Sequence, residues 1–175
     1  MKHTLIVAAA TLLAINTTNA SEMKQIRIST DRTDLVLQVA ENGRLYQSYF
    51  GEKLLNEADL NQLGWSVHAA SDGSVSRRGW EVYSGSGNED FFEPAVAITH
   101  NDGNPSTWLY YVSHSTHEVE GGVQTDIVLR DNQYPVEVTL HYVAYPQENV
   151  IKTWSDIRHE EKKPILLSAY ASTML

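Results

Sequence analysis

Over most of the chain, apolar and polar residues alternate in short runs, a pattern typical of strands with one buried face. The clearest run is 136–142, where Val136, Val138, Leu140 and Tyr142 alternate with polar residues. The predicted strands are 24–29, 35–39, 44–50, 80–83, 95–100, 108–113, 123–130, 136–142, 150–158 and one that begins at Ile165. Many short strands with one apolar face predict an all-β protein, an antiparallel β-sandwich rather than a parallel sheet.

Turn signals separate these runs. Asn42-Gly43 lies between two of them and predicts a two-residue hairpin loop, in which Gly43 supplies the positive φ that the turn requires. One short helix is predicted near 53–63, where four leucines could share a broad face. Glycine and serine are dense over 64–90, so we expect a long loop there, of a kind that is more often functional than filler.

The first twenty residues have the parts of a secretory signal peptide. A short polar start precedes the apolar run 5–15, and the small residues Thr18 and Ala20 stand at positions −3 and −1 before Ser21. This run is too short for a bilayer span, which needs about 20 residues. We therefore predict a signal peptide at 1–20 and a β-sandwich domain at 21–175, exported to a bacterial periplasm or exterior without a membrane anchor. The alternative is a buried N-terminal helix.

Composition and charge exclude several classes of function. The chain of 175 residues has no cysteine, which excludes a disulfide scaffold, a Cys-ligated metal site and a cysteine nucleophile. It has 13 Lys and Arg against 22 Asp and Glu, a formal net charge of −9, which argues against a nucleic-acid partner.

Acidic residues gather at three places, which raises the question of a catalytic carboxylate pair. Glycoside hydrolysis uses two carboxyl groups about 5–5.5 Å or about 6.5–9.5 Å apart, depending on the stereochemical outcome. The candidate groups are Glu89, Asp90 and Glu93, then Glu118 and Glu120, then Asp31 and Asp34. Acidic loop residues are more often simply solvated, so no catalytic pair is assigned within this chain.

A His-x-x-His spacing at His114 and His117, beside Glu118, is the one candidate for a metal site. Its context predicts a strand end, where residues three apart point to opposite faces. No metal and no cofactor is therefore expected. The aromatic residues Trp65 and Trp80 lie in or near the predicted loop, where they could contact a sugar or cap the core.

Two stretches of sequence have a familiar order and spacing. The first is 87–96, GNEDFFEPAV, which matches G-x-x-D-[FY]-R-x-P-A-[LIV] except that Phe92 stands for Arg. The second comprises 110–114, Gly121-Gly122, 136–142 and 149–157, with Thr153 in place of a usual Arg. Together they resemble the N-terminal β-domain of glycoside hydrolase family 36, the α-galactosidases, over about 25–175.

The resemblance implies an N-terminal supersandwich domain that precedes a (β/α)8 barrel. In such retaining enzymes one barrel aspartate is the nucleophile and another the acid/base, both beyond residue 175, so no catalytic residue is expected here. The family domain runs on past this point and the chain ends in an apolar run, so the sandwich is expected to be incomplete at its C-terminal end. The implied partners are the catalytic barrel, an α-galactoside and a further copy in a homo-oligomer.

The resemblance also implies a site. Asp90 and Phe91 fall in the matching block and are expected at the rim of the sugar site, where they would bind substrate. The alternative is that Asp90 caps a turn and Phe91 is part of the core. Two alternatives for the whole chain also stay open: a free-standing carbohydrate-binding β-sandwich module and a purely structural assembly domain.

Overall fold

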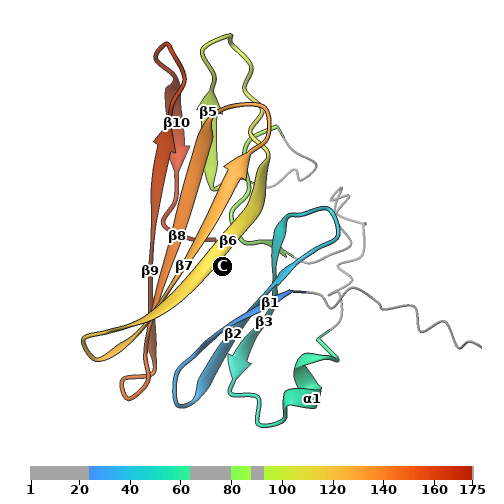
Figure 1. The fold of residues 1–175 in the computed structure, drawn as a ribbon, viewed down its shortest axis with the longest axis vertical. Coiled ribbons are helices and arrows are strands. Elements are labelled where there is room, and N and C mark those ends of the chain that lie inside the picture. The colour runs from blue at the N-terminus through green and yellow to red at the C-terminus, as the bar shows by residue number, and fades with distance from the viewer. Residues whose placement is uncertain (1–23, 64–79, 88–92, 175) are drawn as a thin grey trace, which may run out of the picture.

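The computed structural model describes residues 24–63, 80–87 and 93–174, which form ten strands and one short helix (Figure 1). All pairings between these strands are antiparallel. The prediction of an all-β antiparallel sandwich with one short helix is confirmed. The elements are β1 (Gln25–Ser29), β2 (Thr33–Val39), β3 (Leu45–Glu52), α1 (Glu57–Leu60), β4 (Trp80–Glu81), β5 (Val96–Thr99), β6 (Leu109–Val119), β7 (Gly122–Asp131), β8 (Val136–Tyr145), β9 (Val150–His159) and β10 (Leu166–Tyr170).

The strands form three sheets around one core. The largest has the order β6-β7-β8-β9; the others are β1-β2-β3-β4 and the pair β10-β5 (Figure 1). Side chains from all three contribute to a single apolar cluster. Its buried members include Ile26, Ile28, Leu35, Leu37, Leu45, Val96, Ile98, Leu109, Ile127, Leu129, Val136, Val138 and Leu140. The two smaller sheets therefore pack on one face of the large sheet.

Strand β8 follows the predicted alternation. Val136, Val138 and Leu140 are buried, while Glu137 and Thr139 between them are half-buried. Successive side chains of a strand point to opposite faces, so the apolar row faces the core and the polar row faces outward. The sequence pattern alone is sufficient to orient this strand.

The predicted hairpin around Asn42 forms, but its loop has three residues instead of two. The amide of Gly43 donates to the Ala40 carbonyl at 2.8 Å, and the amide of Ala40 donates to the Arg44 carbonyl at 2.9 Å. Gly43 has a φ of 78°, whereas the only non-glycine residue with positive φ in the described part of the chain is Asn149. This is a turn followed by a left-handed glycine, which does not need a positive φ at Asn42.

Two predicted elements have different lengths in the structure. The helix expected over 53–63 is the single turn α1, because Leu54 is held by other groups: its amide donates to Asp34 and its carbonyl accepts from Arg27, both at 2.7 Å. Leu55 is 89% exposed, so the leucines share no apolar face. The strand expected to stop at Ser113 continues as β6 to Val119.

Some predictions concern parts of the chain outside the described residues. These are the signal peptide at 1–20 and most of the long loop expected over 64–90. Within the described ranges, no helix is long and apolar enough to cross a membrane.

Truncating a side chain at the centre of the core should destabilise the fold. We predict that Ile127→Ala, at a fully buried position, lowers the free energy of unfolding by about 3 kcal/mol, because it removes buried apolar surface and leaves a cavity. Urea unfolding measures this change. Val123→Ala, on the same strand but 37% exposed, is the matched control and should change it by less than about 0.5 kcal/mol. Equal losses would contradict the assignment of the core.

Candidate functional site

Asp90 and Phe91, the two residues expected at a sugar site, lie outside the described residues. The segments that lead into and out of 88–92 are described, as is the loop that packs against them. We call residues 84–87, 93–96 and 105–107 the loop base. The loop base comprises the described residues on either side of 88–92 and the segment that packs against them.

Backbone hydrogen bonds hold the two ends of the loop base together. Gly85 and Val96 form a parallel bridge, in which the Ser86 amide donates to the Val96 carbonyl at 3.0 Å and the Val96 amide donates to the Ser84 carbonyl at 3.1 Å. The Thr107 amide donates to the Ser86 carbonyl at 2.9 Å. The described chain on either side of 88–92 is therefore joined through Gly85 and Val96, and 105–107 is joined to it through Ser86.

Two glycines make this close packing sterically feasible. A Cβ on Gly85 would lie 2.1 Å from the Thr107 carbonyl oxygen. Gly87 has a φ of 72°, and a Cβ there would lie 2.5 Å from the Ser106 hydroxyl oxygen. The Ser86 hydroxyl donates to the Pro105 carbonyl at 2.5 Å. The glycine and serine spacing over 84–87 thus reflects a close approach of two backbones.

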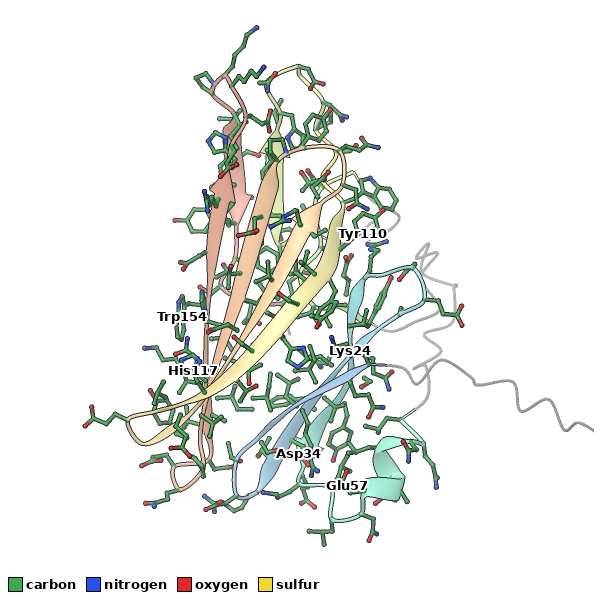
Figure 2. The ribbon with its side chains drawn as sticks, in the orientation of Figure 1. Lys24, Asp34, Glu57, Tyr110, His117 and Trp154 are labelled. Atoms are coloured by element: carbon green, nitrogen blue, oxygen red, sulfur yellow. The ribbon has the colours of Figure 1, made fainter. Side chains whose placement is uncertain are left out.

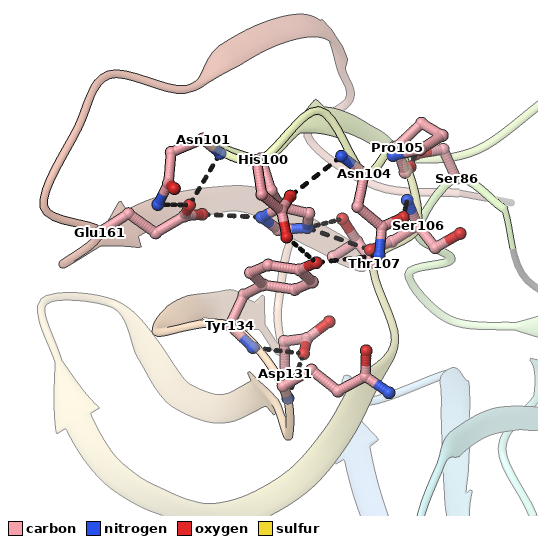
Figure 3. A network of polar contacts seen from close by, with 12 residues as sticks. Ser86, His100, Asn101, Asn104, Pro105, Ser106, Thr107, Asp131, Tyr134 and Glu161 are labelled. Atoms are coloured by element: carbon pink, nitrogen blue, oxygen red, sulfur yellow. Dashed lines mark hydrogen bonds and ion pairs between the residues drawn. The ribbon is translucent and has the colours of Figure 1, made fainter.

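A buried histidine, His100, contacts the 105–107 segment of the loop base (Figure 3). His100 Nε2 lies 3.0 Å from the Ser106 carbonyl and 3.2 Å from the Thr107 hydroxyl. Its Nδ1 lies 2.7 Å from a carboxylate oxygen of Glu161. The ring also stacks on Tyr134, with centroids 3.6 Å apart and an interplanar angle of 7°. Three connections far apart in the sequence therefore meet at one imidazole.

Glu161, in the connection between β9 and β10, is the anionic member of this network. Its side chain is 1% exposed, and its second oxygen accepts from the Asn101 amide at 3.0 Å and the Asn101 side chain at 2.5 Å. Burial alone would raise the pKa of Glu161. The donors from Asn101 and His100 outweigh burial and hold that pKa below its ordinary value.

Asp102 and Asp131 stabilise the turns that follow β5 and β7 by accepting hydrogen bonds from backbone amides. Asp102 accepts from the Asn104 amide at 3.0 Å and the Tyr134 hydroxyl at 2.9 Å, and these two donors lower the pKa of Asp102. Asp131 accepts from the amides of Trp108 at 2.6 Å and Gln133 at 2.7 Å. The loop base thus rests on a network of satisfied polar groups.

One predicted acidic candidate, Asp34, has a structural role. Its buried carboxylate accepts from Arg27 at 2.7 Å, Ser29 at 2.5 Å and the Leu54 amide at 2.7 Å (Figure 2). Burial opposes the charged form, but these donors lower the pKa of Asp34 overall. The carboxylate holds the segment after β3 against β1 and β2. The remaining acidic candidates that the structure describes, Asp31, Glu93, Glu118 and Glu120, are exposed.

His114 and His117 lie within β6 rather than at a strand end, and they face opposite sides. His114 pairs with buried Ile127, and its Nδ1 lies 2.8 Å from the Tyr111 hydroxyl; burial and the charge of Lys24 lower the pKa of His114. His117 is on the outer face, 3.7 Å from Asp126. Among the described residues, no group of three or more His, Asp or Glu side chains could hold a metal ion.

The motif at 87–96 indicated the loop base, but no sequence pattern indicated the pair of His100 and Glu161 that contacts it. His100 and Glu161 are separated by 61 residues, and Glu161 lies in a run of charges that reads as a solvated turn. No local pattern indicates that one of those charges is buried. Chemically, the described part of this site is a scaffold. The Thr107 hydroxyl, His100 and Glu161 lie in a row, but Thr107 and His100 are buried, so this hydroxyl is out of reach of a substrate.

Comparison with known proteins gives the family of this architecture. The model of the glycosyl hydrolase family 36 N-terminal domain matches residues 43–175. The fold is similar to α-galactosidase AgaB from Geobacillus stearothermophilus (24% identity, TM-score 0.72) and to the α-galactosidase from Lactobacillus brevis (17%, 0.70). A variant of α-galactosidase AgaA from Geobacillus stearothermophilus, in complex with raffinose, is also similar (24%, 0.70).

These alignments cover 86%, 85% and 86% of this chain but only 23%, 23% and 24% of the solved chains. The chain therefore spans about a quarter of the length of these relatives. Comparison with curated proteins gave no match.

The close approach at Gly85 gives a stability prediction. Gly85→Ala should lower the free energy of unfolding by about 2 kcal/mol or more, because the new methyl group overlaps the Thr107 carbonyl. Gly103→Ala is the matched control: Gly103 has a φ of 90° but open space around it, so only backbone strain of about 1 kcal/mol is expected. Chemical denaturation compares the two, and an equal or smaller loss for Gly85→Ala would contradict the close approach.

The buried carboxylate of Glu161 gives a pH prediction. Because its folded pKa is below its ordinary value of 4.5, its contribution to stability is complete above that value and is lost as the pH falls through the folded pKa. Glu161→Gln should therefore lower stability by about 2 kcal/mol at neutral pH and should flatten the fall in stability as the pH decreases below 4.5. Glu118→Gln, which removes an exposed carboxylate, controls for the lost charge. An unchanged slope in Glu161→Gln would contradict this role.

Proposed function

The chain belongs to the glycosyl hydrolase family 36 N-terminal domains, and on this basis we propose that it serves as the non-catalytic N-terminal domain of a secreted α-galactosidase. The observation that carries the proposal is the family match over 43–175 on an antiparallel sandwich similar to α-galactosidases. Those relatives are about four times as long as the matched part. Hydrolysis of terminal α-galactosides would take place on a barrel that follows this domain, with two aspartates of that barrel.

In this proposal the domain has two tasks. It supports the barrel and contributes to contacts between copies of the enzyme, and it brings 88–92 to the rim of the sugar site. The first twenty residues would direct export to a bacterial periplasm or exterior and would then be removed.

The role at the rim follows from the chemistry of Asp90 and Phe91. A carboxylate accepts hydrogen bonds from sugar hydroxyl groups, and an aromatic ring covers the apolar face of a pyranose. The loop base supports this assignment because its backbone bridge joins the described chain on either side of 88–92, and the His100–Glu161 pair holds the segment 105–107 that packs against it. A rigid base reduces the ordering cost when a sugar binds.

Substitution in the full-length enzyme tests the rim. We predict that Asp90→Ala and Phe91→Ala each raise KM for raffinose about tenfold and leave kcat less affected, because each removes a binding contact and no reacting group. Steady-state kinetics measures both constants. Glu93→Ala, an exposed residue just outside the segment, is the matched control. If neither substitution changes KM, the two residues have no role at the rim.

The isolated mature chain distinguishes this proposal from a free-standing carbohydrate-binding module. A domain that contributes only one side of a sugar site should give no heat of binding with galactose or raffinose in calorimetry. Measurable binding by the isolated chain would favour the module instead.

A further inference from the structure

The hairpin between β2 and β3 carries a chemically reactive pair of residues at its tip. Asn42 is the only asparagine in the sequence that is followed by glycine. The backbone nitrogen of the residue after an asparagine can attack the side-chain carbonyl carbon, and glycine hinders this attack least because it has no side chain. Asn42 is exposed, so water reaches its side chain. The local sequence therefore favours reaction, and the geometry of the loop determines how fast it proceeds.

Three hydrogen bonds hold the groups that would react. The Gly43 amide donates to the Ala40 carbonyl at 2.8 Å. The side-chain nitrogen of Asn42 donates to the Tyr46 hydroxyl at 3.1 Å, and its side-chain oxygen accepts from the Arg44 amide, also at 3.1 Å. Tyr46 is only 2% exposed, so packing in the core fixes the acceptor of the Asn42 side chain. We call residues 40–44 the hairpin loop, and this bonded state its closed form.

The first step of the reaction cannot take place while the hairpin loop is closed. The Gly43 nitrogen loses its proton to water or hydroxide and forms a bond to the side-chain carbonyl carbon of Asn42. The bond from that carbon to Nδ2 breaks, and ammonia leaves. The resulting succinimide ring has neither the N–H that Ala40 accepts nor the NH2 group that Tyr46 accepts. Two of the three hydrogen bonds must therefore be lost before the ring can form.

Water completes the reaction by opening the ring at either of its two carbonyl carbons. Attack at the former side-chain carbon leaves an aspartate at position 42. Attack at the main-chain carbon leaves an isoaspartate, in which the chain runs through the former side chain and is one carbon longer. In sum, one amide and one water give one carboxylic acid and one ammonia, and no oxidant or reductant is needed. We propose that Asn42 is a site of spontaneous deamidation, and that opening of the hairpin loop sets its rate in the folded protein.

The modification would change a contact between two sheets. The Gly43 carbonyl accepts from the Tyr111 amide of β6 at 2.8 Å and so joins the hairpin loop to the large sheet. An isoaspartate lengthens the main chain just before Gly43 and displaces this carbonyl, so the modified loop loses that hydrogen bond. The inference goes beyond the proposed function, because it depends only on the hairpin loop and water and would hold for any activity of the longer protein.

Mass spectrometry of the full-length protein tests the site. Trypsin cleaves after Arg32 and Arg44 and so releases 33–44 as one peptide. After incubation at mildly alkaline pH in water enriched in heavy oxygen, this peptide should show conversion of one amide to an acid that contains a solvent oxygen. The folded protein should react about tenfold or more slowly than the synthetic peptide 33–44, because the loop is closed in most molecules, and urea should restore the peptide rate. No conversion in urea, or the peptide rate in the folded protein, would overturn the proposal.

Hydrogen exchange of the Gly43 amide measures loop opening independently. The same N–H must leave the Ala40 carbonyl in exchange and in ring closure, and ring closure must also break the contact with Tyr46. Folding should therefore slow deamidation by a factor at least as large as the protection of this amide from exchange. A smaller factor would mean that the ring forms in the closed loop, and this result would overturn the role of loop opening.

A pair of variants tests the contact with Tyr46. Tyr46→Phe removes the acceptor of the Asn42 side chain and should speed deamidation of the folded protein about fivefold, the change expected from the loss of one hydrogen bond. Tyr49→Phe, on the same strand, removes a hydroxyl that donates to the Glu52 carbonyl at 2.7 Å; it is the matched control and should leave the rate unchanged.

Urea unfolding shows whether both variants remain folded. If Tyr46→Phe does not fold, the comparison of deamidation with hydrogen exchange in the unaltered protein decides the question. Equal acceleration in two folded variants, or no acceleration in folded Tyr46→Phe, would overturn the proposed control by the hairpin loop.

Discussion

The apolar row on the inner face of β7 and β8 is the feature on which the rest of the fold depends. Ile127, Leu129, Val138 and Leu140 are all buried, and both smaller sheets contribute side chains to the cluster that covers them. A strand slip of one residue would expose this row to water and bury charged residues such as Asp126. The register of the large sheet therefore determines where β5, the loop base and the β1–β4 sheet can pack.

The polar interior near the loop base follows a second constraint, the cost of burying polar groups. His100 and Glu161 are both buried, and each has partners within hydrogen-bond distance at both of its polar ends. A buried polar network stabilises a unique arrangement only when all of its members are satisfied. Here it fixes three connections that apolar contacts alone would leave free to slide.

The sequence predicted elements well wherever one face of a strand is apolar. It oriented β8 because burial alternates over 136–142, the run with the clearest apolar pattern. It ended β6 too early because residues 113–118 are polar on both faces, and pairing with β7 alone keeps them extended. It overestimated the length of α1, because the hydrogen bonds of Leu54 with Asp34 and Arg27 are tertiary contacts that a local pattern does not show. The motif at 87–96 indicated where the site begins, but the pair of His100 and Glu161 joins residues whose neighbours in sequence show no sign of it.

The outer face of the large sheet is governed by charge in the way that its inner face is governed by apolar burial. On that face His141 lies between Asp126 at 2.6 Å and Asp156 at 3.2 Å and stacks on Trp154, so its charged groups already have partners within the chain. Burying this face would remove several hydrated charges from water at a high desolvation cost. Desolvation therefore opposes packing of a further apolar layer on this face, whereas the inner face of the same sheet is covered by side chains from both smaller sheets.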